Sequence, residues 1–291
     1  EADFSEKNPS GVGGGALPGG IGWYRKHFTV DKNEPYSRFF IDFDGVYMNS
    51  DVYLNGHLLG HRPYGYISFE YDMTPYIKCG GDNVIAVRVD NRDQPNSRWY
   101  SGCGIYRHVY LVKTQNVRVA HWGTYISCNK VSETDAIVNI KVELVTNESK
   151  AVKTSVSNSL MDAFGKVLER KDTTVMVAPS PSRTPLCQQM GVSRPILWSI
   201  DNPYLYKVLT VVRQGNRIVD TYTTQIGVRT FKFDPDYGFF LNGKNMKING
   251  VCDHHDLGCL GAAINEDALH RQLVLLKNMG CNAIRCSHNP P

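Results

Sequence analysis

The chain has 291 residues, of which 42% are hydrophobic and 21% are charged, and its formal net charge is +4. These are ordinary values for a globular protein, and the length suggests two or three domains. The small net charge and the lack of a Lys/Arg run argue against nucleic acid as a partner. No apolar stretch approaches the ~18 residues that a membrane span needs, so we expect no membrane span.

Residues 1–115 are predicted to be all-β. Short segments rich in β-branched and aromatic residues alternate with turn residues: WYRKHFTV, RFFIDFDGV, SDVYLNGHLLG, ISFEYDMT, NVIAVRVDN and RHVYLVK. The pair Asn55-Gly56 is the strongest short-range signal for a β-hairpin. So many strands with regular turns predict a sandwich or barrel, and we interpret this domain as a jelly roll.

Residues 116–231 are predicted to form a second, immunoglobulin-like β-sandwich. The strand-like segments are AIVNIKVELVTN, AVKTSVSNSLMD, KVLERKDTTVMVAP and YLYKVLTVVRQGNRIVDTYTTQIGVRTFKF. Their spacing suits a small sandwich, although no Cys…Trp…Cys signature accompanies them.

Residues 232–291 change to a βαβ pattern. In NEDALHRQLVLLKNMG, Asn265 is a plausible N-cap, Gly280 marks the helix end, and leucines recur at helical spacing. Strand-like runs, MKINGV and CNAIRCSH, lie before and after this helix. A single βαβ unit cannot bury both faces of a parallel sheet, so we expect these residues to begin a larger α/β domain, a TIM (β/α)8 barrel.

The segment KINGVCDHHDLGCLGAA (residues 247–263) concentrates ionisable side chains behind the first of these strands. A metal site is disfavoured, because no pair of ligands has C-x2-C or H-x3-H spacing and adjacent histidines on a strand face opposite ways. A nucleophile site is disfavoured too, because no G-x-S-x-G motif exists. Most of the eight cysteines, Cys286 included, are expected to pack as small buried hydrophobes.

The remaining interpretation depends on where the strands end. His254 and His288 each follow an apolar strand, one helix apart, and the C-terminal strand ends of a TIM barrel form its active-site rim. We therefore expect the two histidines side by side at that rim, with Asp253, Arg285 and Asn289 nearby. The alternative is two ordinary loop histidines.

The sequence resembles the N-terminal portion of glycoside hydrolase family 2 enzymes of the bacterial β-galactosidase type. The resemblance covers essentially the whole chain. It rests on GGGALPGGIGWYRKHF, VYLNGHLLGHRPYGYISFEYDMTPYI, NSRWYSGCGIYRHVYL and the combined pattern GVRTFKFD…GFFLNGKNMKINGVCDHHDLGCLGAA…LLKNMGCNAIRCSHNPP. It implies a jelly-roll sugar-binding domain, an immunoglobulin-like domain and a TIM-barrel catalytic domain, in the same order as the β, β, βαβ pattern.

The resemblance also implies roles for residues. His288 in RCSH and His254 match histidines on the substrate side of the pocket, and Arg285 matches an arginine beneath it that can orient carboxylates. Other branches carry Asn-Arg-His-Glu where this chain has CDHHD, which leaves the roles of Asp253 and His255 open. Asn96 and Arg98, in NSRW, lie where the first domain of relatives reaches toward the active site; the alternative is a turn with a structural arginine.

The mechanism implied is retaining hydrolysis by two glutamates, both of which lie on later barrel strands in the family. No glutamate of this chain sits in a matching motif, so no catalytic residue is expected here. The expected substrate is a β-galactoside-containing oligosaccharide or glycan. The alternatives are a β-glucuronidase or β-mannosidase of the same family, or a non-catalytic carbohydrate-binding protein of two sandwiches.

The remaining expectations concern cofactors, assembly and location. No cofactor is expected within this chain, although the complete enzyme of this family can use Mg²⁺ or Na⁺, with ligands mostly downstream. We expect the complete enzyme to be a homo-oligomer. A periplasmic or secreted location is expected rather than a cytoplasmic one, with a secretory leader removed before Glu1.

Overall fold

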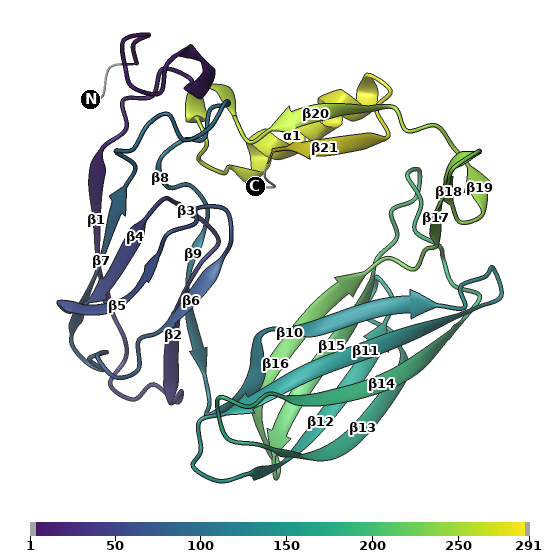
Figure 1. Cartoon of the computed structure of the whole chain (residues 1–291). Coiled ribbons are helices and arrows are strands. Elements are labelled where there is room, and N and C mark those ends of the chain that lie inside the picture. The colour runs from purple at the N-terminus through teal and green to yellow at the C-terminus, as the bar shows by residue number, and fades with distance from the viewer. Residues whose placement is uncertain (1–3, 289–291) are drawn as a thin grey trace. The chain divides into compact units, whose positions relative to one another are not determined.

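The computed structural model describes residues 4–288 and divides into two compact units. One unit joins the chain up to Lys113 with the chain from Asn249 onward, and the other is Thr114–Ile248 (Figure 1). The second unit is thus inserted in the sequence of the first. Within residues 4–288, no helix is long and apolar enough to cross a membrane.

The first unit begins with a two-sheet antiparallel sandwich. A four-stranded sheet has the order β1 (Ile21–Thr29), β7 (Asp82–Asp90), β4 (Ser50–Leu54) and β5 (His57–Arg62), and a three-stranded sheet has β6 (Phe69–Asp72), β2 (Arg38–Phe43) and β9 (Val109–Thr114). A short pair, β3 (Val46–Tyr47) and β8 (Gly104–Ile105), and a 3-10 turn, η1 (Val12–Gly14), complete it. Strand β7 alternates buried and half-buried residues, as a strand with one face in the core should.

The hairpin predicted at Asn55-Gly56 is confirmed. Both residues join β4 to β5 with positive φ, 51° and 87°, which is the backbone of a type I′ turn. The Asn55 side chain also accepts the Val84 amide at 2.9 Å and donates to the Tyr76 carbonyl at 2.8 Å. The turn residue therefore ties the hairpin to the next strand.

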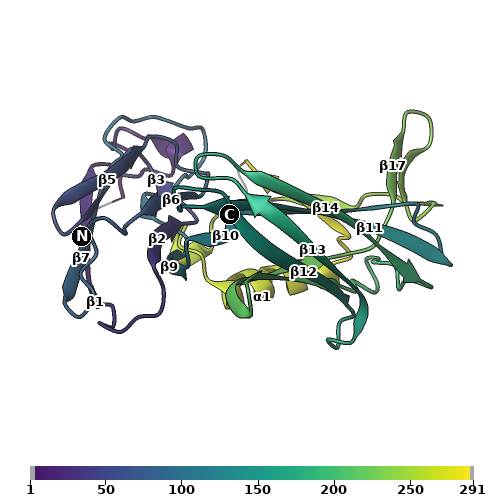
Figure 2. The same ribbon diagram turned by 90° about the horizontal axis from the view of Figure 1, so that it is seen from below.

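The second unit is a larger sandwich whose long strands are visible in Figures 1 and 2. Its three-stranded sheet has the order β10 (Val117–Asn129), β11 (Asp135–Thr146) and β14 (Thr184–Ser193). Its four-stranded sheet has the order β13 (Val167–Val177), β12 (Val152–Met161), β15 (Tyr206–Gln214) and β16 (Arg217–Ile226). Leu144, Leu160 and Val212 are fully buried in the core between the sheets. A small antiparallel meander follows: β17 (Phe231–Asp234), β18 (Gly238–Leu241) and β19 (Lys244–Asn245).

The βαβ unit of the sequence is present. It consists of β20 (Gly250–His254), a 3-10 turn η2 (Gly258–Leu260), α1 (Glu266–Asn278) and β21 (Ala283–Ser287), and the two strands are parallel. Asn265 caps the helix by accepting the Ala268 amide at 2.9 Å, and Gly280 follows with φ +99°. The first strand begins at Gly250, later than the run MKINGV suggested. No residue of α1 is buried, since one helix and two strands cannot enclose a core.

The expectation about cysteines is wrong. All eight lie in the described part of the chain, and none is buried: six are exposed, and Cys128 and Cys281 are half-buried. Cys252 belongs to β20 and Cys286 to β21, which together form a sheet of only two strands. Burial preferences for cysteine presuppose a covered strand, and little covers these two.

Candidate functional site

Two histidine rings meet at the C-terminal ends of the parallel strands. His254 is the last residue of β20 and pairs with Ser287 in register, so His288 follows one position beyond. The ring centroids of His254 and His288 lie 5.4 Å apart, edge to face at 82°. The structure thus brings together the two residues that the sequence placed at one rim. Both are exposed and can meet a ligand.

Arg285 lies on the same pair of strands and is held in place by its neighbours. Its Nη1 donates to the Ser287 hydroxyl at 2.9 Å and to the Cys252 sulfur at 3.4 Å. Hydrogen bonds from Ser287 and Arg285 lower the pKa of the Cys252 thiol. The arginine is exposed, and a guanidinium fixed in this way can take a carboxylate in two parallel hydrogen bonds.

His255 has a different environment from its neighbour His254. It is 4% exposed, and its Nε2 donates to the carbonyl oxygen of Ser101, in the first sandwich, at 3.2 Å. Strand alternation turns adjacent residues to opposite faces, so one histidine faces the rim while the next anchors the loop. His255 therefore has a structural place in this chain.

An aromatic cluster surrounds His255 and joins the first sandwich to the loop after β20. Tyr66 and Tyr106 lie 5.8 Å and 6.3 Å from the His255 ring, and Tyr106 packs with Tyr47 and Ala262 in a small buried core. Burial raises the pKa of both Tyr66 and Tyr106, as expected in a dry interface. This cluster fixes the loop against the sandwich.

The other predicted residues are placed less directly. Asp253 pairs in register with Cys286, and strand alternation puts it on the face opposite His254. Asn96 accepts the Tyr47 hydroxyl at 3.0 Å and donates to Asn91 at 2.7 Å, within the sandwich loop. Arg98 is exposed. Asn289 lies outside the described residues.

One residue at the rim was missed by the sequence analysis. The indole of Trp99 lies 4.4 Å from the imidazole of His288, tilted by 47°. Trp99 belongs to the loop after β7, next to Arg98, so the first sandwich does reach the rim. The motif NSRW contained the residue, but only the tertiary contact distinguishes it from its neighbours.

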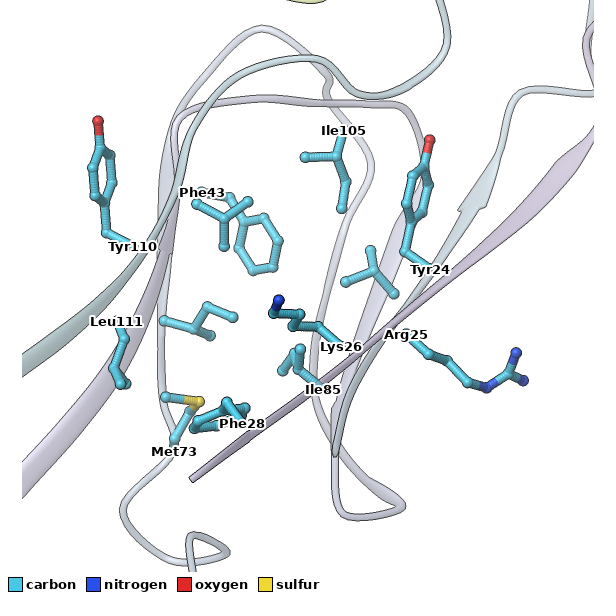
Figure 3. A pocket seen from close by; sticks show the side chains of 13 residues that line it. Tyr24, Arg25, Lys26, Phe28, Phe43, Met73, Ile85, Ile105, Tyr110 and Leu111 are labelled. Carbon is cyan, nitrogen blue, oxygen red and sulfur yellow. The ribbon is translucent and has the colours of Figure 1, made fainter. Parts of the chain in front are cut away.

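The first sandwich also holds an apolar cavity of about 480 Å³, lined by residues of β1 and β9 and by core residues between them. Figure 3 shows apolar side chains such as Phe43, Ile105 and Leu111 around it, while the Arg25 guanidinium points away. Sugar binding needs converging hydrogen-bond groups, which this lining offers sparsely. The cavity is therefore an opening of the sandwich core rather than a sugar pocket.

Metal ligands do not converge in the described residues. Among residues 4–288, no three His, Cys, Asp or Glu side chains are grouped closely enough to hold an ion. A Mg²⁺ or Na⁺ ion does not fit the side chains at this rim, where two imidazoles and a guanidinium gather.

Comparison with protein families gives three matches in series. The descriptions are "Glycosyl hydrolases family 2, sugar binding domain" for residues 16–115, "Glycosyl hydrolases family 2" for residues 117–229, and "Glycosyl hydrolases family 2, TIM barrel domain" for residues 235–291. The rim residues His254, Arg285 and His288 all lie in the barrel match.

Individual relatives agree with this assignment. β-Galactosidase BoGH2A of Bacteroides ovatus is 56% identical over 100% of this chain and 34% of its own length. A putative β-glucuronidase of Formosa agariphila is 43% identical over 97% of this chain and 26% of its own length. A crystal structure of a glycosyl hydrolase family 2 member from Bacteroides cellulosilyticus matches with TM-score 0.94 and 39% identity, over 100% of this chain and 37% of that one. The chain thus spans about a quarter to just over a third of the length of these proteins.

Proposed function

Because the chain belongs to glycosyl hydrolases family 2, we propose that the whole protein is a retaining exo-β-glycosidase that hydrolyses terminal β-D-galactosides. The observation that carries the proposal is the meeting of His254 and His288 at the C-terminal ends of two parallel barrel-type strands. The 56% identity to a protein named β-galactosidase supports galactose as the sugar.

In this proposal the two histidines bind sugar hydroxyls. A neutral imidazole has one donor and one acceptor nitrogen, which suits a ligand that offers both kinds of partner. Arg285, fixed by Ser287 and Cys252, would orient a carboxylate from another barrel strand. The acid and the nucleophile of the double displacement would be two glutamates outside residues 1–291, with carboxyls about 5–5.5 Å apart.

A second candidate is a β-glucuronidase, favoured by the 43% identity to a protein with that name. The two functions share the fold and the mechanism and differ in the group at C5 of the sugar. A carbohydrate-binding protein without activity is disfavoured by the barrel match of residues 235–291, which two sandwiches would not need.

The test is hydrolysis of nitrophenyl β-galactoside, β-glucuronide and β-mannoside by the whole protein. We expect the galactoside to give the highest kcat/KM. We also expect NMR to show that the sugar, when first released, has the β configuration. A glucuronide preferred over the galactoside would replace the first candidate by the second. No turnover of any of the three, in a folded protein, would remove the enzyme proposal.

A further inference from the structure

The first sandwich contributes one side of the surroundings of His288. The indole of Trp99 lies 4.4 Å from the imidazole, and His254 meets the same imidazole at 5.4 Å. Two of these three rings come from the barrel strands, whereas Trp99 comes from the loop between β7 and β8. The His288 ring is therefore in contact with neighbours from both parts of the first unit.

The loop that carries Trp99 is firmly attached at its beginning. Asp90, at the end of β7, accepts hydrogen bonds from Arg88 and Arg92, each at 2.8 Å. Asn96 bridges Tyr47 and the rest of the loop, as described above. These bonds connect the start of the loop to β7 and Asn96 to Tyr47.

The end of the loop is attached as well. The Ser97 hydroxyl donates to the carbonyl of Trp99 itself at 2.6 Å. Two residues later, the Ser101 carbonyl accepts from buried His255 at 3.2 Å, so the loop is bonded to the segment that follows His254. The Trp99–His288 contact therefore joins two anchored segments.

We propose that Trp99 is a positioning residue for His288, fixing the imidazole orientation in which it contacts the sugar. The proposal rests on the function proposed above. A side chain just beyond a strand end has several rotamers, and an indole packed against one side restricts them. His288 is exposed, so part of the imidazole remains accessible to a ligand. Trp99 thus acts through His288, and the sugar site is incomplete without the first sandwich.

Kinetics of the whole protein test this directly. Trp99→Ala should lower kcat by about 10- to 100-fold with a smaller change in KM, because a misplaced group loses mostly transition-state contacts. Trp99→Phe keeps an aromatic face and should restore part of the loss. The matched control is Trp23→Ala: Trp23 is also a tryptophan of this sandwich, but it is 49% exposed and lies beside Tyr53 and Arg25. It should keep wild-type kinetics.

A double-mutant cycle separates positioning from direct sugar contact. If Trp99 acts through His288, Trp99→Ala should have little further effect in a His288→Ala background. Additive losses would overturn the proposal and make Trp99 an independent contact. A raised KM with an unchanged kcat in Trp99→Ala would also overturn the proposal.

A measurement without turnover keeps the two proposals distinguishable. In the NMR spectrum of residues 1–291, Trp99→Ala should shift the His288 Hε1 resonance by removing the ring current, while Trp23→Ala should not. An unchanged His288 resonance in Trp99→Ala would overturn the positioning role. If the whole protein hydrolyses none of the glycosides, the proposed function fails, and this spectrum alone decides the orientation of His288.

Discussion

His255 donates a hydrogen bond to the Ser101 carbonyl across 154 positions of sequence, at 3.2 Å, and both residues are almost fully buried. One end of this bond belongs to the sandwich and the other to the loop after β20. A buried donor that loses its acceptor costs about 1–3 kcal/mol, so the bond favours one arrangement of loop and sandwich. The position of the rim histidine next to His255 depends on it.

We expect His288→Ala to lower kcat/KM of the whole protein. The loss should correspond to about 2–4 kcal/mol of transition-state stabilisation, which is the size of losing a positioned donor in a dry site. His254→Ala should act in the same direction and less strongly, because its motif departs from that of other family branches. The control is His270→Ala, on the exposed side of α1. Steady-state kinetics and metal analysis check both variants. Wild-type kinetics in both would remove the sugar-binding role, and zinc lost on either substitution would point to a metal site.

Residues 1–291 alone should show no glycosidase activity. The function proposed above places both catalytic glutamates outside this chain, and without them neither proton transfer nor the covalent intermediate is available. The measurement is nitrophenyl β-galactoside turnover by the purified chain, compared with a heat-denatured sample. Any turnover above that background that follows the folded chain through chromatography contradicts the prediction.

Gly102→Ala should destabilise the first unit. Gly102 has φ +70°, and an added Cβ would lie 2.4 Å from the Cβ of Ala262, in the buried interface of the loop after β20. Gly56 is the matched control, because it has φ +87° and nothing within 4 Å of an added Cβ. The crowding should make Gly102→Ala worse than Gly56→Ala by about 1–3 kcal/mol.

Denaturant unfolding of both variants measures this difference. Adding Ala262→Gly to Gly102→Ala reopens the space and should recover the part of the loss that is due to crowding. Equal destabilisation by the two single substitutions would mean that only backbone strain matters at Gly102.

The loop that carries Trp99 should lose stability in acid. Hydrogen bonds from Arg92 and then Arg88 lower the pKa of Asp90 to about 2, below the 3.8 of an ordinary aspartate. A folded-state pKa below the unfolded one stabilises the protein above the unfolded value, and this stabilisation is lost as pH falls through the folded value. Asp90→Asn should therefore be less stable than the wild type at pH 6, and the difference should shrink between pH 4 and pH 2. A difference in unfolding free energy that stays constant over this range would contradict the assignment.

Cys252 should react with iodoacetamide at lower pH than Cys128. The hydrogen bonds of Ser287 and Arg285 lower the pKa of Cys252, whereas burial raises the pKa of Cys128 in the second sandwich. The thiolate is the reacting form, so mass spectrometry of residues 1–291 after timed alkylation reports the order. Arg285→Leu should slow the labelling of Cys252 and leave that of Cys128 unchanged. An unchanged labelling rate of Cys252 in Arg285→Leu would show that Arg285 does not stabilise the Cys252 thiolate.

Features with a local cause were predictable from the sequence. The Asn55-Gly56 turn and the Asn265 cap depend on backbone preferences of single residues, and both are found as expected. Strands β10 and β14 were not singled out. β14 contains Pro185 and Gly191 among polar residues, and β10 has an irregular register between Val119 and Thr124, which breaks the alternation.

Features that depend on packing were harder to predict. Strand order and chain direction placed His254 and His288 together, because parallel strands end at the same edge. Trp99 is in no pattern that distinguishes it from a core tryptophan, and its contact with His288 joins segments that are far apart in the sequence. The cysteine expectation failed at Cys252 and Cys286 because a two-stranded sheet leaves them uncovered, while Cys79, Cys103 and Cys259 lie outside the strands.

The insertion of residues 114–248 also separates the two parts of the first unit in time during synthesis. Tyr66 and Tyr106 leave the ribosome long before His255 and Ala262, their partners in the aromatic cluster. At the usual rate of translation the delay is on the order of ten seconds, which is long compared with the folding of a small sandwich. During that interval the tyrosines of the cluster lack the residues that cover them. Slow translation of the codons for residues 114–248 would prolong their exposure.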